Sequence, residues 1–560
     1  MRLSPRKRLF GKISSAPWTA AVVILAAGAS PAAVPLAARQ GPKSLEATPY
    51  KNTRWGFQVN MFTKWNAVPP QPTEPFEVAK FATPQPINHK TGAYLHDISI
   101  LRFDPEGRSS STLERGKGEG PTTGGGEGSE PPKEDEKPKK PELTEDDLRK
   151  LNQQLRDKSF TEYLEGNYKP VEKVKVSKRK FGKLDATVHE FKVKSGIAGT
   201  NICYYSVVFM APDKSEIVLH YSMPDFKYDE WKDLFIQSAS SFKFIGVTSN
   251  ESTIAAAKSM LDADRLRHKE DVEQTPGWAL LETKHYFIKH DVSDQGFLKE
   301  LQERIEAIYG VYEKRFLGDK KLQAIAEKAA QAEDASYKKG GAGKNTKPVL
   351  RVVKDEKEYY QYGGPGGSAG YFSPMSGELV VPCFKSINLV LTWAVLNHEA
   401  FHQFIHHFFG ELSPHSWFNE GTGDYYAGWR YQPNGKFDIK PLSGWAEGLD
   451  RLSLIREWVR DSKYVPFEEF LRYTQQQYYS GSGVHHYSQG WSIIYFFMRG
   501  KEQGVRPWRP EWDRFLSDYL EKLMETKDLT QAIDYATRDL QGGKMKELEE
   551  AWKRFVGDIK

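Results

Sequence analysis

Two histidines and a glutamate stand at the spacing of a metal-binding helix. The string is HEAFH, in which His398 and His402 flank Glu399. Apolar residues recur around this string near the period of a helix, which predicts that it is helical. Residues four apart share one helix face, so both imidazoles can reach a single ion. A zinc site takes nitrogen ligands at about 2.0 to 2.1 Å, and a catalytic one leaves its fourth position to water.

A second motif supplies a third ligand. After a short turn comes WFNEGTGD, which contains Glu420 and, four residues later, Asp424. Glu420 is the candidate carboxylate ligand beside His398 and His402. Asp424 shares its helical face and can accept the free ring N–H of a ligand histidine, which fixes the tautomer. Glu399 is left over from ligation and is the candidate general base, because a carboxylate at the open position can take a proton from water.

HExxH followed by a short loop and WFNEG resembles the gluzincin metallopeptidases, here an uncharacterised bacterial, peptidase MA-like type. The resemblance implies a His-His-Glu zinc site, completed from a second helix, in a thermolysin-like domain. The interval between His402 and Glu420, residues 403 to 419, is slightly shorter than in thermolysin, which predicts a tighter loop. The metzincin pattern needs Gly at 405 and His at 408. Ile405 and Phe408 stand there, so that alternative is excluded.

The same resemblance points to a catalytic tyrosine. YSQG, which begins at Tyr487, is similar to the YxKG motif of zinc aminopeptidases, whose tyrosine hydrogen-bonds the oxyanion. Gln489 replaces the lysine of that motif, so a tyrosine buried in a helical core is the alternative. His485 and His486 are neighbouring candidates for the same role. Three further histidines are expected to be ordinary core or surface residues: His406, His407 and His415.

The N-terminus has the pattern of a secretory signal peptide. Basic residues precede an apolar run over 18 to 27, and small residues follow, which predicts a signal segment over 1 to 38. An uncleaved anchor is the alternative. The segment predicts an exported protein, periplasmic or extracellular, and no later apolar run reaches the length of a membrane span. Cys203 and Cys383 are too few for a disulfide framework and are expected to be buried thiols.

Length and hydrophobic patterning indicate an α+β protein of several domains. With 560 residues, 39% of them apolar, the chain has room for about two to four domains. Period-two alternation predicts an antiparallel-sheet module over 47 to 247, whose GFQVNMF opening and SFKF ending weakly resemble the PsbP-like fold. A Gly-, Pro-, Lys- and Glu-rich insert over 105 to 142 interrupts the module and is expected to be disordered. Strands are expected at 54 to 62, 76 to 82, 93 to 103, 186 to 193, 203 to 210 and 216 to 223.

A helical connector is expected over 248 to 277, and the resemblance implies that the metallopeptidase domain occupies 278 to 560. That domain should begin with a strand, a helix and a strand, and continue into an edge strand within 371 to 382. In gluzincins such an edge pairs with an extended substrate. Helical periodicity predicts a helical C-terminal part, with its first helix over 443 to 459.

The expected function is zinc-dependent hydrolysis of peptide or protein substrates. The GAMEN exopeptidase signature is absent, so an endopeptidase is expected. A formal net charge of +5, from 79 basic and 74 acidic residues, indicates no nucleic-acid partner. The alternative function is a catalytically silent zinc-binding domain that binds peptides or cell-envelope partners. The sequence does not indicate an oligomeric state.

Overall fold

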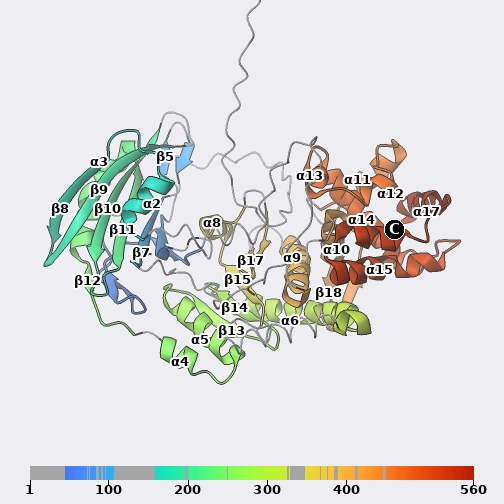
Figure 1. The fold of residues 1–560 in the computed structure, drawn as a ribbon, viewed down its shortest axis with the longest axis horizontal. Helices are drawn as coiled ribbons and strands as arrows, with labels where there is room; N and C mark the ends of the chain where they lie inside the picture. Colours follow the sequence, from blue (N-terminus) through green and yellow to red (C-terminus); the bar gives the residue numbers. More distant parts are fainter. Residues whose placement is uncertain are drawn as a thin grey trace, which may run out of the picture.

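A computed structural model gives the fold of the chain (Figure 1). The described residues are 44–71, 74, 76–83, 87–89, 92–94, 96–105, 158–195, 200–248, 250–324, 327, 347–365, 368–374, 376–383, 389–409, 414–445 and 449–560. The predicted signal peptide lies outside them, as does the predicted disordered insert apart from Pro105. Within these residues, no helix has the length and apolar character needed to cross a bilayer.

The N-terminal part is built on a seven-stranded antiparallel sheet of order β3-β4-β7-β11-β10-β9-β8. The alternation in the sequence predicted an antiparallel sheet, but it did not predict β3 or β8, and the strand predicted over 93 to 103 is divided between β6 of a separate hairpin and β7. Helix α3 packs on one face, together with a small sheet of β1, β2 and β12, and helix α2 packs on the other. The elements are β1 Tyr50–Asn52, β2 Phe57–Val59, β3 Asn66–Val68, β4 Glu77–Ala82, β7 Asp97–Phe103, α2 Phe160–Asn167, β8 Lys175–Phe181, β9 Leu184–Lys194, β10 Asn201–Met210, β11 Glu216–Pro224, α3 Asp225–Ser240 and β12 Lys243–Phe244, with a separate hairpin of β5 Ile87–His89 and β6 Gly92–Tyr94.

Strand β10 shows why this sheet forms. Its side chains alternate between two buried clusters, because successive residues of a strand point to opposite faces. Tyr205 and Val207 pack toward α3, whereas Tyr204 and Val208 pack toward α2. Both faces of the sheet are therefore covered, and the strand is apolar along most of its length.

The first predicted strand is wrong in its extent. Instead of one strand over 54 to 62, a turn separates β1 from β2. Gly56 occupies this turn with φ +69°, a left-handed conformation that other residues rarely adopt. The sequence pattern is apolar on both sides of Gly56, so periodicity alone could not place the turn.

The second part of the chain is organised on a five-stranded sheet of order β13-β14-β15-β17-β16. The three central strands are parallel, and the strand at each edge is antiparallel to its neighbour. Helices α6 and α9 cover one face, and α5 of the connector and α8 lie against the other (Figure 1). The elements are α4 Glu251–Ala255, α5 Met260–Glu273, β13 Ala279–Glu282, β14 Phe287–His290, α6 Gln295–Tyr312, the π-helical turn η1 Glu313–Leu317, β15 Val349–Val353, α8 Glu356–Gln361, β16 Tyr371–Ser373, β17 Glu378–Pro382 and α9 Leu389–Phe409.

A buried charge cluster fixes the connector to this sheet. Lys289 on β14 lies 2.7 Å from Asp271 of α5 and 2.9 Å from Glu378 of β17. Arg351 on β15 lies 2.8 Å from the other oxygen of Glu378, which also accepts the Tyr362 hydroxyl at 2.9 Å. Since each buried charge has an opposite partner, the face can remain polar without an unpaired ion.

The C-terminal part is helical, as predicted, with α14 at its centre in contact with α10, α11, α13, α15 and α17. The predicted helix over 443 to 459 is wrong at its start, because α11 begins at Arg451, where Asp450 accepts the backbone N–H of Ser453 as a cap. The hairpin of β18 and β19 was not predicted. The elements are α10 Ser416–Ala427, β18 Trp429–Tyr431, β19 Phe437–Ile439, α11 Arg451–Arg460, α12 Phe467–Phe470, α13 Gln475–Tyr479, α14 Gly483–Arg499, α15 Pro510–Thr526, α16 Leu529–Thr537 and α17 Lys544–Asp558.

Candidate metal centre

Helix α9 carries the HEAFH string and is fixed by polar side chains within its own length. The Asn397 side-chain amide donates to the carbonyl oxygens of Tyr426 at 3.2 Å and Trp429 at 2.9 Å. The Gln403 side-chain amide donates to the Val349 carbonyl of the sheet at 2.8 Å. These bonds hold the helix against α10 on one side and the sheet on the other, so its histidines have a defined direction.

Helix α10 carries the second motif, and its glycines allow two close approaches. A Cβ on Gly423 would lie 2.8 Å from the imidazole of His398, and a Cβ on Gly421 would lie 2.6 Å from the carbonyl oxygen of Gly490 on α14. Any larger residue would push α10 away from α9 or from α14. The EGTG sequence therefore allows the glutamate of α10 to reach the histidines of α9.

Three side chains of the two helices converge on one point. Ligand atoms of His398, His402 and Glu420 all lie within 4.8 Å of one another, and all three residues are buried. Glu420 Oε2 lies 3.3 Å from His398 Nε2 and 3.9 Å from His402 Nε2. A tetrahedral ion with bonds of about 2.0 to 2.1 Å separates its ligand atoms by roughly 3.3 to 3.4 Å. The distance from Glu420 to His398 equals this spacing, and the distance from Glu420 to His402 is longer than it.

The same atoms lack hydrogen bonds. His398 Nε2, His402 Nε2 and Glu420 Oε2 are buried and have no hydrogen-bond partner among the described residues. A buried polar atom without a hydrogen-bond partner lowers the stability of the fold by about 1 to 3 kcal/mol. Three such atoms at one point therefore require an explanation. A cation bound by all three would satisfy them together. The two imidazoles and the carboxylate are a donor set that zinc accepts.

Each histidine is held from behind through its other nitrogen. His398 Nδ1 lies 3.1 Å from Asp424 Oδ1, as the helical spacing of Asp424 predicted. His402 Nδ1 lies 3.1 Å from Asn419 Oδ1. Arg451 of α11 in turn lies 2.6 Å from Asp424 Oδ2. The Nδ1 contacts leave Nε2 of both rings directed at the common point.

Neither Asn419 nor Arg451 was identified from the sequence. Asn419 stands inside the WFNEG motif, directly before Glu420, so its position was a usable signal. Arg451 comes from a helix that begins 27 residues after Asp424 and has no motif of its own.

The carboxylates around the site attract positive charge. Burial opposes protonation of His398, but Asp424 and Glu420 outweigh it and raise the pKa of His398 to about 10, so a proton occupies this ring when no ion is bound. Burial lowers the pKa of His402 to about 4, so its ring is neutral and its lone pair is free to ligate. Burial would raise the pKa of Asp424, but Arg451 and His398 outweigh it and hold that pKa below its usual value. Burial also opposes ionisation of Glu420, yet its contacts with the two histidines lower its pKa. The site thus presents two carboxylates in their ionised form.

Glu399 lies beside the ligands but is held differently. Its Oε2 accepts the backbone N–H of Phe372, on edge strand β16, at 3.0 Å. Its Oε1 is buried and has no hydrogen-bond partner among the described residues. Burial, followed by the nearby carboxylates, raises the pKa of Glu399 to about 8. A carboxylate with one fixed and one unpartnered oxygen is suited to exchange a proton with a molecule at the site.

The predicted tyrosine packs against a residue that contacts Glu420. Tyr487 is buried, its ring packs on Tyr478 and Tyr479, and the Arg451 guanidinium lies 5.1 Å from its centre. The hydroxyl of Tyr479, from α13, donates to Glu420 Oε1 at 2.8 Å and so leaves Oε2 available. Tyr479 was not identified, because nothing in the QQQYYSGSG sequence marks it.

The other candidate histidines make contacts outside the ligand cluster. His485 stacks on Trp458, with ring centres 4.3 Å apart, and the Nδ1 of His486 lies 2.8 Å from the Tyr478 carbonyl oxygen. The remaining three, expected to be ordinary residues, pack against aromatic side chains: His406 against Phe372, His407 against Phe408 and His415 against Tyr519.

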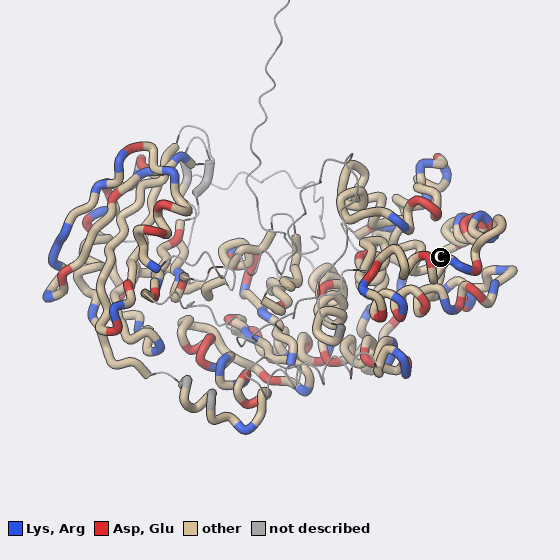
Figure 2. Tube along the Cα trace, in the orientation of Figure 1, with Lys and Arg blue, Asp and Glu red and all other residues tan. Residues whose placement is uncertain are grey.

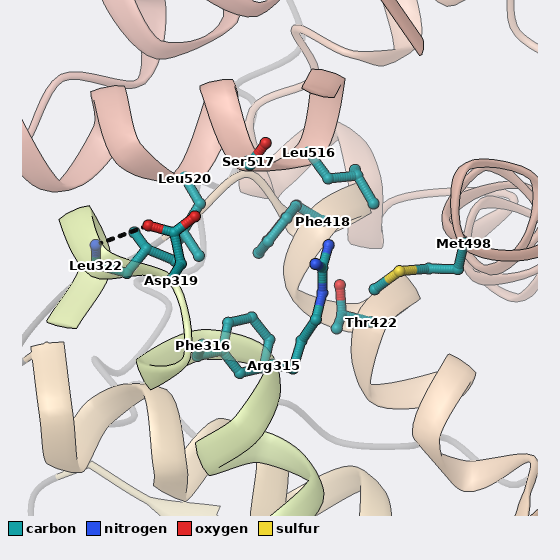
Figure 3. Close-up of a pocket in the computed structure, with 10 residues that line it drawn as sticks. All are labelled: Arg315, Phe316, Asp319, Leu322, Phe418, Thr422, Met498, Leu516, Ser517 and Leu520. Atoms are coloured by element: carbon teal, nitrogen blue, oxygen red, sulfur yellow. Dashed lines mark hydrogen bonds between the residues drawn. The ribbon is translucent and has the colours of Figure 1, made fainter. Parts of the chain in front are cut away.

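A small pocket lies on the other side of α10 (Figure 3). Phe418 and Thr422, which flank Glu420 in sequence, contribute to it together with apolar residues of η1 and α15. It offers about 30 Å³, enough for a single water molecule. A peptide therefore cannot occupy it, and the candidate metal centre lies on the opposite side of the helix.

The chain was compared with protein-family models, with curated proteins and with solved structures. No family model matches the chain, and no curated protein matches it. Among solved structures, the chain is similar to the solution structure of cyanobacterial PsbP (CyanoP) from Synechocystis sp. PCC 6803. The identity is 14%, the match covers 38% of this chain and 99% of that chain, and the TM-score is 0.20.

Proposed function

We propose that this chain is a zinc-dependent metallopeptidase with a thermolysin-like, gluzincin-type catalytic domain. The observation that carries the proposal is the set of unpartnered buried atoms on His398, His402 and Glu420, with the unpartnered oxygen of Glu399 beside them. A core that served only stability would pair these groups or replace them with apolar residues.

His398, His402 and Glu420 would hold the zinc through the three atoms that lack partners. When bound, zinc lowers the pKa of water and polarises a carbonyl group. Glu399 accepts the proton of the attacking water on Oε1, while the Phe372 N–H holds Oε2 in place. Tyr487 remains the proposed donor to the oxyanion, and it packs against Tyr479, which contacts Glu420.

Strand β16 supplies the proposed substrate surface. It is the edge strand of the five-stranded sheet, next to β17, and its Phe372 N–H contacts the candidate base. An extended peptide can add to such an edge through main-chain hydrogen bonds, which places a scissile bond near Glu399. Pairing along an edge does not depend on a free chain end, so we propose an endopeptidase that acts on peptides or proteins.

The N-terminal signal pattern supports export of this enzyme. The second candidate function is a zinc-binding domain without catalysis that binds peptides or cell-envelope partners. The observation behind this alternative is that burial raises the pKa of Glu399 to about 8 in the metal-free protein, where a protonated Glu399 lacks the basic oxygen.

The test combines metal content with peptide cleavage. We expect one zinc per chain by elemental analysis, loss of zinc in His402→Ala, and retention in His407→Ala, which is the same substitution on the same helix outside the cluster. Wild type should cleave members of a diverse peptide library, lose cleavage with a chelator and regain it with zinc. Zinc content that His402→Ala leaves unchanged would exclude the ligand set. Bound zinc without any cleavage would favour the silent alternative.

Tyr479→Phe is expected to weaken zinc binding by about 10- to 100-fold, the usual effect of removing a group that orients a metal ligand. The hydroxyl that holds Glu420 Oε1 is lost while the ring is kept, so folding should change little. Competition with a chelating dye measures the affinity. Tyr473→Phe is the matched control, because its hydroxyl donates to Glu469 outside the site. Equal affinities for the two variants would show that Tyr479 does not position Glu420.

A further inference from the structure

A run of basic residues covers one strand of the N-terminal sheet and its two ends. The segment from Lys173 to Lys183 contains six basic residues and no acidic one. The formal net charge of the whole chain is +5, so the other residues together sum to −1 (5 minus 6). Overall balance therefore conceals a basic surface, which we call the β8 strip and define by Lys173, Lys175, Lys178, Arg179, Lys180 and Lys183.

The β8 strip is exposed on both faces of its strand. Six successive residues, Lys175 to Lys180, are exposed, although side chains in a strand alternate between faces. β8 is the terminal strand of the seven-stranded sheet and pairs with β9 alone among the described strands. Its seven residues extend over roughly 20 Å. Figure 2 shows basic positions along this outer edge, at the end of the molecule away from α9 and α10.

Most of this charge is not neutralised by neighbours. Within the described part of the chain, Lys173, Lys175, Lys178 and Lys183 have no ion pair. Arg179 and Lys180 lie 3.9 Å from Glu190 and Asp185, at the limit of an ion pair. Charged side chains, lysine in particular, protect a sheet edge against pairing with another chain, so part of this charge has that explanation. Four basic side chains without an acidic partner among the described residues also leave this edge able to attract an anionic surface.

We propose that the β8 strip binds a membrane surface containing anionic phospholipids. Basic side chains on both faces of an outer edge strand can turn toward an anionic surface that lies against that edge, and each lysine or arginine near such a surface adds to the attraction. Binding to single-stranded nucleic acid relies on exposed aromatic rings for base stacking, and Phe181, the aromatic residue of β8, is 3% exposed. The apolar run over 18 to 27 precedes the same part of the chain and would add a second attachment if it is retained.

Co-sedimentation of the full chain with vesicles tests the proposal. Wild type should bind vesicles of phosphatidylglycerol and phosphatidylcholine more strongly than phosphatidylcholine alone, and the difference should disappear at high salt. The triple variant Lys175→Gln, Lys178→Gln and Lys183→Gln should lower partitioning to anionic vesicles on the order of 100-fold, at about fivefold per residue. Its thermal unfolding should match that of wild type, because all three side chains are exposed.

A matched variant distinguishes loss of the β8 strip from a general loss of positive charge. Lys299→Gln, Lys436→Gln and Lys546→Gln remove the same charge at exposed positions on α6, the β18–β19 turn and α17, and should retain binding. Equal losses in both triple variants would overturn the proposal, as would equal binding of wild type to anionic and neutral vesicles. Displacement from anionic vesicles by single-stranded DNA at lower concentration than by free phosphatidylglycerol micelles would also overturn the lipid assignment.

Discussion

Replacing Glu399 with glutamine should lower peptide hydrolysis by about 10² to 10⁴-fold, the usual contribution of a general base, while zinc content stays at the wild-type value. Glutamine keeps the shape of the side chain, and its amide oxygen can still accept the Phe372 N–H. What it loses is the basic oxygen at Oε1, which is the atom without a partner. The effect should therefore fall on turnover, with the metal ligands unchanged.

Glu549→Gln is the matched control for this change. Glu549 also accepts a backbone N–H from another element, that of Phe467 at 2.8 Å, but it lies on α17 outside the candidate centre. Its glutamine variant should cleave the peptide library at the wild-type rate. Equal cleavage by wild type and Glu399→Gln would indicate a contaminating peptidase. No cleavage by wild type across the library would favour the silent zinc-binding alternative.

The parts of the site that the sequence predicted are those fixed by helix geometry. His398 and His402 are four apart, as are Glu420 and Asp424, so each pair has to share a face once its segment is helical. The sequence alone did not show that the two helices place Glu420 beside the histidines. That prediction came from the resemblance to the gluzincins. In the structure this placement depends on glycines of α10, which allow that helix to approach α9 and α14.

The residues that the sequence did not indicate depend on tertiary packing. Arg451 and Tyr479 contact site residues from α11 and α13. The loops before these helices determine where the two side chains lie, and hydrophobic periodicity does not predict the conformation of a loop. The fold shows the same limit. Alternation predicted the antiparallel strands, but the start of α11 was misplaced because apolar residues continue the helical period ahead of Asp450, whereas the cap at Asp450 sets the first turn.

Arg451→Met should destabilise the metal-free protein by about 3 to 5 kcal/mol, the cost of breaking a buried ion pair on one side. The side chains of Arg451 and Asp424 are 3% and 0% exposed, and their atoms lie 2.6 Å apart. Without the guanidinium, the Asp424 carboxylate remains buried beside His398 with one oxygen uncompensated. Denaturant unfolding in the presence of a chelator measures the change free of any contribution from zinc.

Two further variants show whether the pair itself is responsible. Arg460→Met removes an arginine from the same helix whose side chain is 72% exposed and pairs with Asp461 at 3.0 Å, and it should change stability by less than about 1 kcal/mol. The double variant Arg451→Met with Asp424→Asn removes both buried charges and should recover most of the stability lost in Arg451→Met. The contrary outcome is a double variant whose free energy of unfolding falls below that of Arg451→Met by the full cost of Asp424→Asn alone. The two residues would then not be energetically coupled, and Arg451 would not be the group that keeps Asp424 ionised beside His398.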